Sequence, residues 1–169
     1  MPAKTAEEKQ IERQWMILHE LDRQSRATKG VTKQELADLC GVSKRTIDRA
    51  VKYVKACNHS SSGGFSYQPG SSPGYARTAA AIYSLQVCGL YEDPLVLKGS
   101  KYLEANHHNS HQWYVYGNFY AAPAQYMIGG KTWERWYKVI ADTIVKDAKP
   151  AGGAYYWPQH RRGGVGPIY

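Results

Sequence analysis

The stretch TKQELADLCGVSKRTIDRAVKY, from Thr32 to Tyr53, predicts two short helices joined by a tight turn. Thr32 precedes the first helix and Glu35 follows three residues later, which is the capping-box pattern. Gly41 suits the left-handed backbone of a sharp turn, and Ser43 is placed to cap the second helix. The expected inward residues are Leu36, Ala37 and Leu39 in the first helix, and Ile47, Ala50, Val51 and Val54 in the second.

The spacing within this stretch is typical of a helix-turn-helix that binds duplex DNA. Such a motif needs a small residue where its helices cross, then a glycine, then an aliphatic residue, and Ala37, Gly41 and Ile47 fill those positions. The outward face of the second helix carries hydroxyl and cationic side chains, which suit phosphates and the guanine edge in the major groove. The candidate DNA-contacting residues are Ser43, Lys44, Arg45, Thr46 and Arg49.

Together with the preceding segment IERQWMILHELDRQ, this stretch resembles the N-terminal helix-turn-helix of WYL-type bacterial transcription regulators, over about residues 11–48. The apolar stripe of Ile11, Trp15, Leu18 and Leu21 predicts a first helix from about residue 5 to residue 24. The resemblance implies a three-helix DNA-binding unit and a homodimer. The alternative is three amphipathic helices that bind no DNA.

Composition favours an anionic partner without identifying one. The formal net charge is +8 and the pI is about 9.3. The positive excess is shared equally between residues 1–57 and the remainder, so its placement on one helix face matters more than its sum. The three cysteines form no CxxC pair, and neither a signal peptide nor an apolar run of membrane-spanning length is found. These features predict a cytoplasmic protein without a membrane span.

A segment rich in Ser, Gly and Pro, residues 58–74, divides the chain. It is either the β-hairpin wing of a winged helix or an ordered glycine–aromatic loop, in which Phe65 and Tyr67 are expected to be buried. We therefore expect three parts: a DNA-binding domain (residues 1–57), this loop or wing, and a helical segment (residues 75–169). The helical segment should contain a buried helix from Tyr75, a helix opened by Asp93-Pro94, a helix that Pro123 kinks or restarts, and an amphipathic helix over residues 131–149 with Trp133, Trp136, Ile140 and Ile144 on one side.

The C-terminal half, about residues 47–169, resembles the α/α-toroid repeats of squalene–hopene cyclases and protein prenyltransferases. The matching features are GGFSYQPG from Gly63, the helix RTAAAIYSLQ, the Trp-rich helix and GGAYYWPQ from Gly152. The resemblance implies alternating inner and outer helices, tied by glycine–aromatic loops, around an apolar cavity. Four or five helices are too few for a closed toroid, and the DxDD acid motif of the cyclases is absent. We therefore expect an incomplete α/α-toroid without a catalytic set.

Other candidate sites are weaker. The HHxxH pattern of His107, His108 and His111 is better explained as a polar turn than as a metal site. No cofactor motif or complete catalytic motif is found, so neither a cofactor nor an enzymatic activity is expected. The aromatic residues Trp113, Tyr114, Tyr116, Phe119 and Tyr120 either line a pocket for an apolar ligand or pack between helices.

The sequence therefore predicts a mainly α protein that binds duplex DNA sequence-specifically as a transcription regulator. The alternative is a fragment of a toroid protein related to terpenoid cyclases, with no DNA-binding role.

Overall fold

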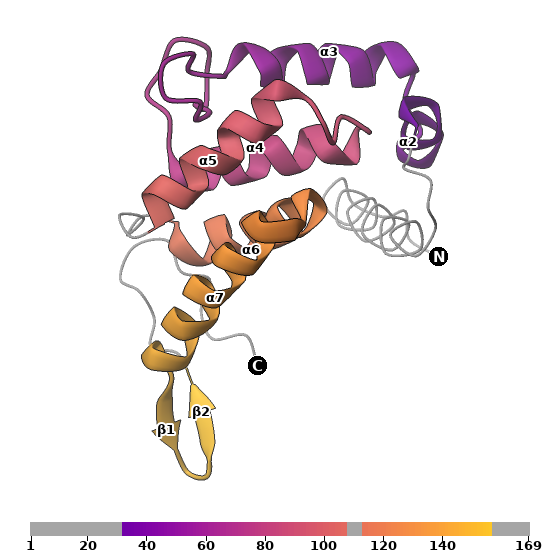
Figure 1. The fold of residues 1–169 in the computed structure, drawn as a ribbon. Helices are drawn as coiled ribbons and strands as arrows, with labels where there is room; N and C mark the ends of the chain where they lie inside the picture. The colour runs from indigo at the N-terminus through magenta and orange to yellow at the C-terminus, as the bar shows by residue number, and fades with distance from the viewer. Residues whose placement is uncertain (1–31, 108–112, 157–169) are drawn as a thin grey trace, which may run out of the picture.

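The computed structural model describes residues 32–107 and 113–156, and this part of the chain is mainly helical, as predicted (Figure 1). Its helices are α2 (Lys33–Cys40), α3 (Lys44–Ala56), α4 (Tyr75–Val87), α5 (Pro94–Asn106), α6 (Tyr114–Ile128) and α7 (Gly130–Asp147). Strands β1 (Lys149–Ala151) and β2 (Ala154–Tyr156) pair in antiparallel fashion after α7. The helix predicted over residues 5–24 lies outside the described residues.

The start of α2 and the turn into α3 have the local geometry predicted from the sequence. The Thr32 backbone N–H donates to Glu35 Oε2 at 2.7 Å, and Thr32 Oγ1 accepts from the Glu35 N–H at 3.2 Å, which completes the capping box. Gly41 ends α2 in the left-handed conformation, with φ of 63°. Ser43 Oγ then accepts from the Thr46 N–H at 3.3 Å and caps α3. The chain therefore turns within residues 41–43 between the two helices.

Helix α4 is the centre of the molecule, because α3, α5 and α6 all pack against it. Its sequence is alanine-rich, and most of its residues are buried, as expected for an inner helix. One hydrophobic cluster extends from Leu36 in α2 through α3, α4, α5 and α6 to Ile140 in α7. The packing is therefore continuous across residue 57, while the functional division of the chain into three parts stays a prediction.

A glycine allows α4 and α5 to approach closely. Gly99 in α5 faces Ile82 in α4, and a Cβ added at Gly99 would lie 2.4 Å from Ile82 Cγ2. Helix α5 begins as predicted, with Asp93 accepting from the Leu95 N–H at 3.0 Å and Pro94 in the first turn. Asp93, at the start of α5, is thereby held beside α3, where it forms an ion pair with Lys55.

The segment 58–74 is an ordered loop, and not a wing of paired strands. Its only bridge among the described residues joins Asn58 to Phe65. Phe65 is fully buried, and its N–H donates to Thr78 Oγ1 at 2.8 Å, so the loop is attached to α4. The expected burial of Tyr67 is wrong, because this side chain is 74% exposed. The neighbouring residue Ser66 takes the inward position and donates from its Oγ to the Cys57 carbonyl.

Several expectations about helix faces need correction. Ala50 is exposed and Leu39 only half-buried, because α3 and α2 bury narrower stripes than the sequence pattern indicated. No new helix begins at Pro123, which lies inside the continuous helix α6. In α7, Trp136 and Ile140 are buried as predicted, but Ile144 is 43% exposed.

The second glycine–aromatic segment forms a β-hairpin. Gly152 and Gly153, with φ of 54° and 84°, make the two-residue turn between β1 and β2. Such turns favour glycine, because both central residues need positive φ. All residues of both strands are exposed, and the hairpin projects from the end of α7 away from the other helices (Figure 1). The two segments that look alike in sequence therefore differ, since residues 63–66 are buried and residues 152–156 are exposed.

Candidate nucleic-acid interface

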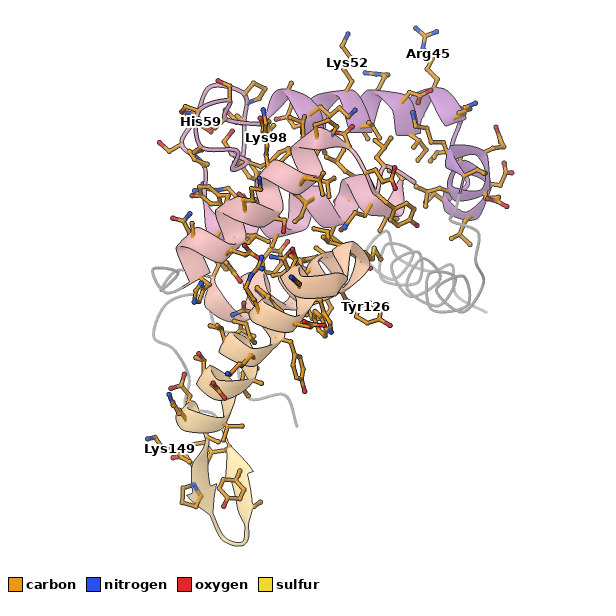
Figure 2. The ribbon with its side chains drawn as sticks, viewed as in Figure 1. Arg45, Lys52, His59, Lys98, Tyr126 and Lys149 are labelled. Carbon is orange, nitrogen blue, oxygen red and sulfur yellow. The ribbon has the colours of Figure 1, made fainter. Side chains whose placement is uncertain are left out.

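One face of α3 is cationic and points away from the rest of the molecule. Arg45, Arg49 and Lys52 follow one another at spacings of four and three residues, which aligns them on one side of a helix with 3.6 residues per turn. All three are exposed. Figure 2 shows Arg45 and Lys52 projecting from the same side of α3, opposite to the side that faces α4 and α5. We call Arg45, Arg49 and Lys52 the cationic face.

The opposite side of α3 anchors it to the core. Ile47 and Val51 are buried at 9% and 8% exposure. Lys55 Nζ contacts Asp93 Oδ2 at 2.6 Å, and the Asp93 side chain is only 11% exposed. Burial by itself would raise the pKa of Asp93, but the hydrogen bonds from Lys55 and from the Leu95 N–H outweigh it and hold the pKa below its usual range. The last turn of α3 is therefore tied to the start of α5.

No carboxylate of the described residues forms an ion pair with the cationic face. None of its three side chains forms an ion pair within residues 32–107 and 113–156. The one carboxylate of α3 belongs to Asp48, which pairs with Lys33 Nζ at 2.8 Å. That hydrogen bond lowers the pKa of Asp48, and the charges of Lys33 and Lys44 act in the same direction. The only carboxylate of α3 is thus paired with a lysine of α2. Within the described part of the chain, the three outward cations have no ion-pair partner and can contact an anionic one.

The predicted contact residues divide into two groups. Lys44, Arg45 and Arg49 are exposed on the first two turns of α3. Ser43 and Thr46 are also exposed, but their hydroxyl oxygens lie 3.0 Å apart and form a hydrogen bond at the start of the helix. These two hydroxyls therefore have a structural role in the cap.

Sequence reasoning missed Lys52. It lies seven residues after Arg45 and three after Arg49, so helical spacing already places it on the same face. The predicted contact residues end in the second turn of the helix, because the contacts of recognition helices are usually concentrated at their N-terminal end. Because α3 continues to Ala56, the cationic face is one turn longer than predicted.

The aromatic residues singled out in α6 have different environments. Trp113 and Tyr116 border a cavity, whereas Phe119 is 61% exposed. Tyr120 is half-buried against Tyr83, with ring centroids 5.9 Å apart. Burial, together with a hydrogen bond to Tyr116, raises the pKa of Tyr120 to about 12. The Tyr114 side chain lies outside the described residues. The aromatic set is therefore divided between cavity lining, packing and solvent.

The histidine motif does not form a recognisable metal site in the described part of the chain. His107 ends α5, with Nδ1 2.7 Å from the Glu104 carbonyl oxygen, and His108 and His111 lie outside the described residues. Residues 32–107 and 113–156 contain no group of side chains arranged to hold a metal ion. Within the same ranges, every helix is too short or too polar to cross a bilayer.

Comparisons with protein-family models, with curated proteins and with solved structures gave no match to this chain. The resemblances to helix-turn-helix regulators and to α/α-toroids therefore rest on the sequence patterns alone.

Proposed function

We propose that this protein binds duplex DNA sequence-specifically, with α3 in the major groove, and that it acts as a transcription regulator. The observation that carries the proposal is the cationic face of α3, whose three exposed cations have no carboxylate partner in the described residues. A helix-turn-helix presents its second helix in this way, with the first helix supporting it. Helix α2 and the left-handed Gly41 turn are compatible with that role.

The diameter of a helix and the axial spacing of the cations on α3 both suit the major groove. A helix rises 1.5 Å per residue, so Arg45 and Lys52 are separated by about 10 Å along the axis. The major groove is about 12 Å wide and admits one helix. Arg45 and Arg49 can each make paired hydrogen bonds to a guanine edge, and Lys52 suits a phosphate as a point charge. A homodimer would repeat this helix at a second half-site.

The test compares variants in fluorescence anisotropy with a duplex selected by the wild-type protein from a random library. We expect Arg45→Ala/Arg49→Ala to weaken binding at least tenfold, because a lost base contact costs about 1–3 kcal/mol. The matched control is Lys138→Ala/Lys146→Ala, which removes two exposed cations from α7, at the other end of the molecule. Circular dichroism checks that both variants keep their helical content.

Two outcomes would reject the proposal. One is a wild-type protein that enriches no sequence from the library. The other is an equal loss of affinity in the α3 and α7 variants, because net charge alone, without a specific face, would then explain binding.

A further inference from the structure

A cavity of about 750 Å³ lies at the junction of four helices. Its walls come from the last turn of α3, the first two turns of α4, the end of α5 and the start of α6, together with the loop that follows α3. Small-molecule sites in proteins measure about 300–1,000 Å³ and are mostly apolar with a few polar groups. The cavity has both properties, and it is separate from the cationic face of α3.

The walls are dominated by aromatic rings. The six aromatic lining residues are Tyr53, Tyr67, Tyr75, Tyr102, Trp113 and Tyr116. Two of the phenols already have partners, since Tyr75 donates to Asn118 Oδ1 at 2.8 Å and Tyr53 to the Tyr67 carbonyl at 3.4 Å. These bonds hold the rings in place, and aromatic walls favour a flat ring that can stack or meet them edge to face.

Arg77 is the only charged residue among the described residues that line the cavity, and it is exposed. It forms no ion pair within the described ranges. Its guanidinium lies across Gly74, because a Cβ at that position would be 2.5 Å from one of its terminal nitrogens. Burial raises the pKa of Tyr102, and the positive charge of Arg77 acts in the opposite direction. One end of the cavity is therefore cationic, and none of the lining residues that the structure describes carries a carboxylate.

We propose that this cavity binds a planar aromatic carboxylate, with its ring between the tyrosine and tryptophan side chains and its carboxylate on the Arg77 guanidinium. Arginine binds carboxylates through two parallel N–H donors, which fixes the orientation of the ligand as well as its charge. A neutral ligand of the same shape would make no charge-assisted hydrogen bonds with this exposed guanidinium. The site does not depend on DNA binding and can be tested without DNA.

The test is isothermal titration calorimetry of the full chain with naphthoate, and with naphthylmethanol as the neutral molecule of similar shape. We expect the wild-type protein to bind naphthoate about tenfold more tightly, which is the effect of one hydrogen bond between charged groups. Arg77→Met should abolish this preference and retain binding of the alcohol. Lys101→Met, which removes an exposed cation of α5 that does not line the cavity, is the matched control and should retain the preference.

The proposal fails if naphthoate gives no saturable heat, if the wild-type protein binds both probes equally, or if Arg77→Met still prefers naphthoate. If Arg77→Met loses its helical circular dichroism, the test depends on the wild-type protein alone. Tighter binding of naphthoate than of naphthylmethanol then supports the proposal, and equal binding rejects it. A cavity-filling variant, Ala80→Trp, should weaken both probes alike, since Ala80 lines the cavity. Unchanged binding of both probes in that variant would place the ligand elsewhere and overturn the proposal.

Discussion

Replacing Gly99 with alanine should destabilise the protein, although Gly99 lies inside a helix. In an exposed helix, Gly→Ala is stabilising by about 0.5–1 kcal/mol. Here the new Cβ would lie 2.4 Å from Ile82 Cγ2, 3.3 Å from Phe65 Cε2 and 3.4 Å from Thr78 Cγ2. Carbon atoms pack favourably at about 3.5–4.0 Å, so α4 and α5 would have to separate by about 1 Å. Ile82, Phe65 and Thr78 are fully buried, so the added methyl group cannot be accommodated by turning a side chain out into solvent.

Overpacking of this kind costs about 1–3 kcal/mol. After subtraction of the gain in helix propensity, we expect Gly99→Ala to lower the free energy of unfolding by roughly 1–2 kcal/mol. Ile82→Leu moves the branch point from Cβ to Cγ and thereby removes the Cγ2 atom at the crossing. The double variant Gly99→Ala/Ile82→Leu should therefore be more stable than the sum of the two single effects predicts, with a coupling of about 1 kcal/mol.

Urea unfolding followed by circular dichroism measures all four proteins of this cycle. A Gly99→Ala variant as stable as the wild type would mean that the two helices separate without cost. Strict additivity in the double variant would mean that Ile82 Cγ2 is not the obstacle. Either result would refute the packing argument for the crossing of α4 and α5.

The remaining predictions concern the two sides of α3. Asp93→Asn keeps an N-cap residue but loses the ion pair with Lys55, so we expect it to lower the free energy of unfolding by about 1 kcal/mol at neutral pH. The pKa of Asp93 is lowered by folding, so its contribution is present above the unfolded-state pKa of about 3.9 and is lost as the pH falls through the folded-state value. Urea unfolding across this range should show the wild type and Asp93→Asn converging in acid; a constant difference would contradict the assignment. Lys52→Ala should weaken selected and random duplexes by the same factor and reduce the slope of log affinity against log salt by about 0.9. Anisotropy titrations in increasing salt measure this, and a loss confined to the selected duplex would mean that Lys52 reads a base.

Local signals in the sequence were sufficient for the helix starts. The caps at Thr32, Ser43 and Asp93 depend on a side chain and the backbone of the next few residues, so they follow from short patterns. The left-handed turn at Gly41 and the burial of α4 were also predicted from local sequence, the first from a glycine after a helix and the second from an apolar, alanine-rich segment.

Features that depend on distant parts of the chain were harder to predict. The exposure of Tyr67 follows from Ser66 taking the inward position in the loop, which involves a carbonyl from the end of α3. The aromatic cavity is built from four helices, and no short pattern indicates that Arg77 lines it. By contrast, the hairpin turn at Gly152 and Gly153 and the position of Lys52 were readable from the sequence, through the glycine pair and the helical spacing.

Helix α3 depends on the rest of the chain for its packing and cannot be transferred to another protein by itself. Val51 and Cys57 are only 8% and 5% exposed, and they belong to the same hydrophobic cluster as Phe65 and Leu103. A fragment that stops at Cys57 would leave these inward side chains in water and would also lack the Asp93 partner of Lys55. Grafting residues 32–57 onto another protein would therefore transfer the charges without the support that keeps them facing outward.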